Sequence, residues 1–265
     1  TNPYRISTCT HVENISEDLS AHYELTQDID CSSTNQDGYN TIASYYESDF
    51  QGVIDGQGHE VQDLYIDEDE NHAAGLVGYN EGTIKNIGVT NVEVNGWDDA
   101  GAVVGFNDGE VVNSYATGDV SGQSGIGGLV GYNYDSGSIK NSYSNMDVTA
   151  YQDQEYAGGL TGYNSGNIEN SYSAGPVESN NGPAGGLVGD NDGGDIQVGY
   201  WGEENSGQSE GIADSNGIGA GSMEVTGLTT SELQGDSAKD NMPEFDFTDM
   251  WCTRTGDYPG LKDAG

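Results

Sequence analysis

Two short acidic runs carry the residue types that a calcium site needs. Their members are Asp67, Asp69 and Asn71 in the first run, and Asp190, Asp192 and Asp195 in the second. Calcium takes six to eight oxygen ligands from carboxylates, carbonyls and water, so each run is a candidate calcium site. His72 stands where an EF-hand loop needs glycine, which excludes that motif. In a chain this acidic, a solvated surface is the commoner explanation of such runs.

Aromatic residues recur at one position of an internal repeat and form a second candidate site. They are Tyr79, Phe106, Tyr132 and Tyr163, and Asp190 takes the same position in the last copy. A position that accepts aspartate should be exposed, and a flat aromatic column suits stacking on sugar rings or docking on a partner protein. Tyrosines that only pack along a sheet face are the competing explanation, and the one we favour.

Three cysteines are present, and two of them are predicted to pair. Cys9 and Cys31 flank the first structural unit at a separation of 22 residues. A disulfide between them would stabilise the fold by about 3 kcal/mol if it restricts the unfolded chain. Two separate buried thiols are the alternative. Cys252 is then left over, and we expect it to be buried beside Trp251.

No catalytic residue is assigned. The four histidines all precede the main repeats, and neither a Ser-His-Asp set nor Cys and His at metal-site spacing stands out. A polysaccharide lyase needs a basic residue, but Lys85 and Lys140 are best explained as solvated lysines on an acidic surface. Glycoside hydrolysis needs two carboxylates about 5–9.5 Å apart, which 45 acidic residues would supply by chance.

The net charge of the chain limits the environments in which it can fold and the classes of partner that it can bind. Lysine and arginine number 6 and aspartate and glutamate 45, which gives a net charge of −39. Such repulsion destabilises a compact state in dilute buffer, whereas about 1 M salt shortens the screening length to about 3 Å. The even spread of acid therefore predicts a salt-adapted surface, with a cation-binding surface as the alternative. Nucleic-acid binding and attraction to an anionic membrane are excluded, because six basic residues cannot form a basic surface. Insertion into a membrane is excluded because no apolar run is long enough.

A repeat of about 27 residues must position these side chains. Its first phrase occurs five times and ends in an asparagine. A second phrase, which contains one isoleucine or valine expected to be buried, follows each copy. The closing asparagines are Asn80, Asn107, Asn133, Asn164 and Asn191, spaced 27, 26, 31 and 27 residues apart. Short β-like phrases with glycine corners at a fixed period predict one coil of a stacked β-solenoid.

Alternation within each phrase predicts which residues face the core. The first inward stack should contain Leu76, Val103, Leu129, Leu160 and Leu187, and the second Ile84, Val111, Ile139, Ile168 and Ile196. The five asparagines should form an internal ladder in which each amide bonds the next coil, about 4.8 Å away. The linkers near residues 98–99, 123–124, 151–155 and 180–183 should project on one edge as a binding face.

Both ends of the chain depart from the repeat and are predicted to cap it. We expect an N-terminal cap and entry segment over residues 1–49, with a short helix capped by Thr10 and ending near Leu19. The β-helix coils should cover residues 50–226, with the five full repeats at about 73–201. A C-terminal cap with a short helix should occupy residues 227–265.

These phrases resemble the GLUG repeat family, named for a Gly-Leu-hydrophobic-Gly core. The core is written Gly75-Leu76-Val77-Gly78 in the first copy, and flanks similar to the family's entry and exit segments lie on both sides. The resemblance implies an all-β, single-stranded right-handed parallel β-helix in a secreted or surface protein, frequently an adhesin. It implies no catalytic site.

The chain is therefore predicted to be a non-enzymatic, adhesin-like or structural β-helix from a halophilic organism, located outside the cell or on its surface. It would present its edge loops and aromatic column to a glycan or a surface protein, with calcium as the one candidate cofactor. A place in a larger surface assembly stays open. The alternatives are a carbohydrate-active β-helix enzyme, either a polysaccharide lyase or a hydrolase, and a self-assembling surface fibre subunit.

Overall fold

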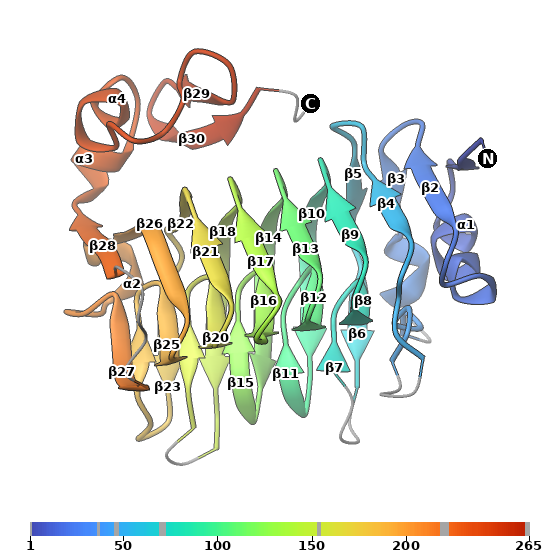
Figure 1. The fold of residues 1–265 in the computed structure, drawn as a ribbon, viewed down its shortest axis with the longest axis horizontal. Helices are drawn as coiled ribbons and strands as arrows, with labels where there is room; N and C mark the ends of the chain where they lie inside the picture. The colour runs from blue at the N-terminus through green and yellow to red at the C-terminus, as the bar shows by residue number, and fades with distance from the viewer. Residues whose placement is uncertain are drawn as a thin grey trace.

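The chain winds into a parallel β-solenoid whose coils stack along one axis (Figure 1). A computed structural model describes residues 2–35, 38–44, 48–68, 73–152, 155–217 and 223–262. The all-β fold class predicted from the sequence is confirmed. Asp69 and Asn71 of the first acidic run lie outside the described residues.

Three parallel sheets form the walls of the solenoid, and each coil contributes strands to them in turn. The aromatic sheet contains β8 (Val77–Asn80), β12 (Val104–Asn107), β16 (Val130–Asn133), β20 (Thr161–Asn164), β25 (Val188–Asp192) and β27 (Ile212–Gly217). The short sheet contains β7 (Ala73–Ala74), β11 (Asp98–Ala100), β15 (Ser124–Gly127), β19 (Ala157–Gly158) and β24 (Ala184–Gly185).

The broad sheet contains the second phrase of each repeat and the residues that follow it, which begin with Asn-Ser-Tyr in three of the repeats. Its strands are β1 (Tyr4–Ile6), β2 (His22–Leu25), β3 (Ile29–Asp30), β4 (Val53–Asp55), β5 (Glu60–Gln62), β6 (Tyr65–Asp67), β9 (Thr83–Lys85), β10 (Gly88–Asn95), β13 (Glu110–Val112), β14 (Tyr115–Gly122), β17 (Ser138–Lys140), β18 (Tyr143–Ala150), β21 (Asn167–Glu169), β22 (Ser171–Ser173), β23 (Val177–Ser179), β26 (Asp195–Gly202) and β28 (Met223–Leu228). Parallel pairing of β2 with β4 means that the solenoid already begins before residue 50.

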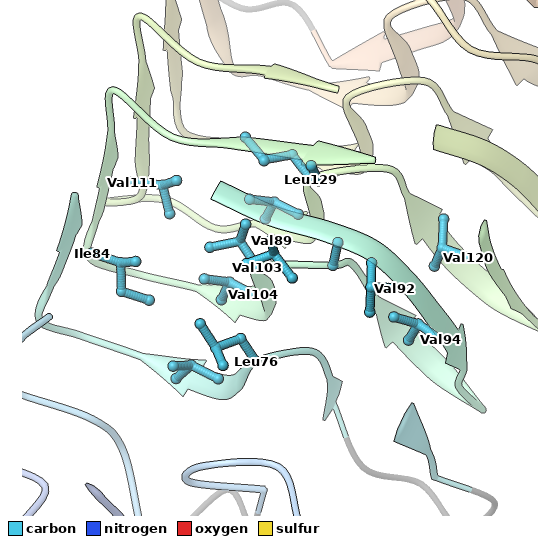
Figure 2. Packing of buried hydrophobic residues seen from close by; sticks show 14 of the residues in the cluster. Leu76, Ile84, Val89, Val92, Val94, Val103, Val104, Val111, Val120 and Leu129 are labelled. Carbon is cyan, nitrogen blue, oxygen red and sulfur yellow. The ribbon is translucent and has the colours of Figure 1, made fainter. Parts of the chain in front are cut away.

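The core is a set of aliphatic stacks inside the coils (Figure 2). Ile84, Val111 and Ile139 are register partners on β9, β13 and β17, and all three are fully buried. Leu76, Val103 and Leu129 are buried in the same way on the other wall. Each aliphatic side chain therefore packs on its counterpart one coil away, as the alternation predicts.

The predicted asparagine ladder is present inside the solenoid. Each Nδ2 donates to the Oδ1 of the next coil, at 2.7 Å from Asn80, 2.9 Å from Asn107, 2.8 Å from Asn133 and 2.6 Å from Asn164. All five asparagines are buried. Since every buried amide meets a partner, the ladder fixes the register of successive coils without leaving polar groups unpaired.

Glycine is required where the coils turn most tightly. A Cβ atom on Gly127 would lie 2.0 Å from the Val130 carbonyl oxygen, and one on Gly158 would lie 2.0 Å from that of Thr161. No side chain fits at these distances, so the glycines before the aromatic sheet allow the corner to close.

The N-terminal segment carries one short helix and a disulfide. Helix α1 (Cys9–Glu13) continues as the 3-10 turn η1 (Asn14–Glu17), and a second such turn, η2 (Ser32–Asn35), follows β3. The N-cap is Thr8, whose Oγ1 accepts from the His11 amide, so the expected cap at Thr10 was wrong. Cys9 and Cys31 form the expected disulfide, with an S–S distance of 2.05 Å.

The C-terminal segment folds back along the solenoid instead of only closing its last coil (Figure 1). It follows α2 (Glu203–Ser206) and β28, and contains α3 (Thr230–Leu233), α4 (Ser237–Asn241) and the antiparallel hairpin of β29 (Trp251–Arg254) and β30 (Asp257–Leu261). Its Trp251 and Phe245 pack on Tyr172 of the broad sheet. Cys252 is only half-buried there, and its neighbour Trp251 is fully buried.

Candidate functional site

The edge linkers and the aromatic column meet in one groove of about 700 Å³. The short sheet and the linkers beside it supply one wall, and the outer face of the aromatic sheet supplies the other. Its lining residues are Trp97, Asp98, Asp99, Gln123, Ser124, Tyr132, Gln152, Glu155, Tyr163, Asn164, Asp190 and Asp192. The groove thus joins three of the four predicted linkers, those near residues 98–99, 123–124 and 151–155, with two rings of the aromatic column, Tyr132 and Tyr163. The linker near residues 180–183 does not line it.

The four aromatic residues form one continuous column on the aromatic sheet. Phe106 is the register partner of Tyr79 and of Tyr132, and Tyr132 is the partner of Tyr163. Ring centroids lie 5.6, 5.4 and 5.5 Å apart from the first ring to the last. All four side chains are half-buried, so each ring combines lateral packing with a partly exposed face.

Hydrogen bonds fix the tyrosine in the centre of the groove. The Tyr163 hydroxyl donates to Glu155 Oε2 at 3.0 Å, and the Ser124 hydroxyl donates to the same oxygen at 2.7 Å. Burial and the nearby Glu155 carboxylate raise the pKa of Tyr163 well above its ordinary value. The phenol therefore stays neutral, and its ring is held in one orientation against the groove wall.

Asp99 is an unusual carboxylate in the opposite wall. It lies on β11 in the left-handed region, with φ of 46°. A Cβ on Gly125 would lie 2.7 Å from Asp99 Oδ1 and 2.9 Å from Tyr163 Cδ2, so only glycine leaves room for both side chains. Burial, and to a smaller degree the charge of Asp98, raises the pKa of Asp99 to about 7. The carboxyl group is therefore partly protonated at neutral pH.

A second shifted carboxylate lies at the far end of the column. Asp190 on β25 is the register partner of Tyr163 on one side and of Asp214 on the other. Burial, then Asp214 and Asp192, raises the pKa of Asp190 to about 6. The Tyr156 hydroxyl donates to Asp214 Oδ2 at 3.3 Å, and its ring packs on Tyr163 at 5.2 Å. The aromatic column thus ends in a pair of carboxylates.

The acidic runs proposed for calcium are placed differently. Asp67 is exposed at the end of β6. In the second run, Asp190 and Asp192 line the groove, while Asp195 begins β26 in the broad sheet. Across the described ranges, no three His, Cys, Asp or Glu side chains gather into a group that could hold a metal ion. Calcium binding stays a prediction.

The sequence predicted that the two lysines of the repeats are solvated, and in the structure each of them forms an ion pair. Lys85 lies 3.1 Å from Asp55, and Lys140 lies 2.7 Å from Glu169 on the next coil. Neither lysine lines the groove.

Sequence reasoning missed a second tyrosine column on the broad sheet. Tyr115, Tyr143 and Tyr172 stack with centroids 5.0 Å apart and interplanar angles of 7° and 6°. Trp251 of the C-terminal segment covers it, and the Tyr172 hydroxyl donates to the Pro259 carbonyl at 2.6 Å. The repeated Asn-Ser-Tyr phrase was the available signal. Because this column is buried, it is structural, whereas the groove column keeps access to solvent.

Other residues in and beside the groove gave weaker signals in the sequence. Trp97 lines the groove beside a linker. Tyr156 and Asp214 do not line it, but they contact two residues that do, Tyr163 and Asp190. Trp97 is 40% exposed. A smaller groove of about 340 Å³ continues along the column and is lined by Tyr79, Phe106, Tyr134 and three carboxylates.

Comparison with known proteins places two of the repeats in a described family. The model of the GLUG motif matches residues 122–149 and 153–178. The chain therefore carries GLUG repeats, and the resemblance seen in the sequence is confirmed.

Two curated relatives are similar to the chain. Halomucin of Haloquadratum walsbyi is 32% identical over 305 aligned residues, which cover 98% of this chain and 3% of halomucin. A candidate Gly-rich membrane protein of Evansella cellulosilytica is 30% identical over 122 residues, which cover 42% of this chain and 14% of that protein. The chain thus spans only a small share of the length of both relatives.

One solved structure has the same fold along the whole chain. It is the crystal structure of a candidate immunoglobulin A1 protease from Bacteroides ovatus, with a TM-score of 0.67 and 20% identity. The superposition covers 100% of this chain and 93% of that one. At this identity the likeness concerns the fold alone. No helix in the described part of the chain is both long and apolar enough to cross a membrane.

Proposed function

We propose that this chain, a β-helix built from GLUG repeats, is a non-enzymatic binding module of a surface or extracellular protein. It holds a glycan or a protein partner in the groove between the edge linkers and the aromatic column. The observation that carries the proposal is the convergence of Tyr132, Tyr163 and Trp97 with five carboxylates on one open groove. Sites that recognise polymers combine aromatic faces with a few oriented polar groups in this way.

A location outside the cytoplasm is supported by three observations. The Cys9–Cys31 disulfide suits an oxidising compartment. One relative is named as a membrane protein, and the other, halomucin, is aligned over nearly the whole of this chain. The net charge of −39 suits a protein exposed to high salt, where the repulsion is screened.

An array experiment tests the binding role. The chain would be applied to glycan and peptide arrays in 1 M KCl, beside a variant that carries Tyr132→Ala and Tyr163→Ala. The variant should lose the ligands that the original chain retains, because it lacks the ring faces of the groove. Tyr4→Ala is the matched control, since Tyr4 is 60% exposed near the N-terminus and stacks on Tyr23 away from the groove.

The folded state of each variant would be checked by thermal unfolding in the same salt. Equal binding by the original chain and a folded double variant would contradict the proposal.

A second candidate function, glycoside hydrolysis, is favoured by one observation. Burial raises the pKa of Asp99 to about 7, and a carboxyl group that keeps its proton near neutral pH suits the role of general acid in a groove that holds further carboxylates. Incubation with a polysaccharide panel in 1 M KCl tests it. Product that disappears in Asp99→Asn would establish hydrolysis, and absence of product from every polysaccharide would remove this candidate.

A further inference from the structure

We propose that the groove binds a basic segment of a partner protein, with a guanidinium or ammonium group held between its carboxylates and its tyrosine faces. This inference rests on the proposed binding function and selects the class of partner. Four observations lead to it, and each concerns a different property of the groove.

The first observation is uncompensated charge. Asp98, Asp99, Glu155, Asp190 and Asp192 line the groove, and none of the described lining residues is a lysine, arginine or histidine. The lysines of the repeats pair elsewhere, with Asp55 and Glu169. A ligand with positive charge would therefore meet carboxylates that have no cationic partner within the groove lining.

The second observation is the order of side chains along the column. Successive coils place Tyr132, Tyr163, Asp190 and Asp214 at one register position. A flat cation can lie against the tyrosine rings, and the adjoining carboxylates can accept its hydrogen bonds. A neutral sugar would use the ring faces, but it would leave the carboxylates uncompensated.

The third observation is the spacing of the acidic groups. Within the described residues, the groove carboxylates do not converge as a set that could hold a metal ion. They are spread over two walls of a volume of about 700 Å³. This arrangement suits an extended ligand with more than one basic group better than a single bound ion.

The fourth observation is a shielded carboxylate oxygen. Asp190 Oδ1 is buried and has no hydrogen-bond partner among the described residues. The groups that face this carboxylate are Asp214 on β27, Asp192 on β25 and the rings of Tyr163 and Tyr156. None of them is a cation, so an arriving cation would stabilise the ionised form. Binding should therefore release a proton near pH 6 and strengthen between pH 5 and pH 8.

Calorimetry with a designed peptide tests the inference. The probe is acetyl-Gly-Arg-Gly-Arg-Gly-amide, and the matched probe replaces both arginines by citrulline, which keeps the shape and removes the charge. The titration is done in 1 M KCl, where the screening length is about 3 Å, so that only contact recognition is measured. The arginine peptide should bind roughly tenfold or more tightly than the citrulline peptide.

Variants locate the interaction. Asp190→Tyr places at this position an aromatic residue like those of the four preceding coils, so the variant should fold. It should bind the arginine peptide roughly tenfold more weakly. Asp119→Asn removes an exposed carboxylate of the broad sheet outside the groove and should leave binding unchanged. Proton release, measured from the dependence of the heat on the buffer, should be smaller in Asp190→Tyr, and the release that remains should come from Asp99, which lines the same groove and also has a raised pKa.

Several outcomes would overturn the inference. Equal binding of the arginine and citrulline peptides, or no binding of either, would do so. An equal loss in Asp119→Asn and Asp190→Tyr would show attraction to the overall charge instead of the groove. Chitosan oligomers and calcium chloride would be titrated as further probes. If either binds and the arginine peptide does not, the groove binds a different cation and the inference is wrong. If the arrays identify a neutral glycan that the original chain binds and the Tyr132→Ala, Tyr163→Ala variant does not, the proposed function is supported and this inference is contradicted.

Discussion

Replacing Asp99 by asparagine should stabilise the protein, and increasingly so as the pH rises. Burial raises the pKa of Asp99 from 3.8 to about 7, so ionising this carboxyl in the folded state costs free energy. A shift of about three units corresponds to an upper bound of about 4 kcal/mol. Because the side chain keeps part of its exposure, we expect about 1–3 kcal/mol at pH 8.

The direction follows from the protons bound in each state. Between about pH 4 and pH 7, the folded state holds the Asp99 proton and the unfolded state does not. The free energy of unfolding of the original chain therefore falls as the pH rises through this window. Asparagine cannot ionise, so the gain should be near zero at pH 4 and reach its plateau above pH 7. Asparagine also tolerates the positive φ of 46° at this position.

The assay is urea unfolding at pH 4, 6 and 8 in 1 M KCl, with Asp119→Asn as the control. Asp119 is exposed, so its replacement should leave the free energy of unfolding unchanged at each pH in this salt. A gain for Asp99→Asn that is equal at pH 4 and pH 8, or a loss at pH 8, would refute the reasoning.

Three further predictions concern the stability of the solenoid. Asn133→Ala should cost about 3 kcal/mol, because Asn107 Nδ2 and Asn164 Oδ1 each lose a buried hydrogen-bond partner. The exposed Asn167→Ala on β21 should cost little, and equal urea midpoints for the two variants would contradict the ladder. Reducing the Cys9–Cys31 bond should cost about 3 kcal/mol, measured as a lower Tm with dithiothreitol in the same salt, and an unchanged Tm would show that the bond adds no stability. Asp119→Asn removes one of three carboxylates in register on adjacent strands. It should raise the free energy of unfolding by about 0.5 kcal/mol at 0.1 M salt and leave it unchanged at 1 M salt. A gain in stability that persists at 1 M salt would exclude charge repulsion as its cause.

The parts of the fold that repeat could be predicted from the sequence. A residue type that returns in every coil reports directly on its environment, which is why the buried Leu and Ile stacks and the asparagine ladder were found. The path of the C-terminal segment could not be predicted. It depends on contacts such as that of Trp251 with Tyr143, which join residues far apart in sequence and occur once.

The candidate site was predicted in outline only. The column and the linkers recur, so their positions could be read from the repeat. The raised pKa of Asp99 comes from burial in the folded chain, and Gly125 leaves the room for Asp99 Oδ1 beside Tyr163 of another coil, which no local pattern reports. Asp214 lies in a coil whose repeat has decayed, and only its pairing with Asp190 reveals its place in the column.

Carboxyl footprinting by mass spectrometry tests most directly that the groove is the binding surface. The chain would be labelled with a carbodiimide and an amine in 1 M KCl, with and without a ligand selected on the arrays. We predict that labelling falls at Asp98, Glu155 and Asp192 and is unchanged at Asp119 and Asp147 on the broad sheet. Protection on the broad sheet with no protection in the groove would contradict the account.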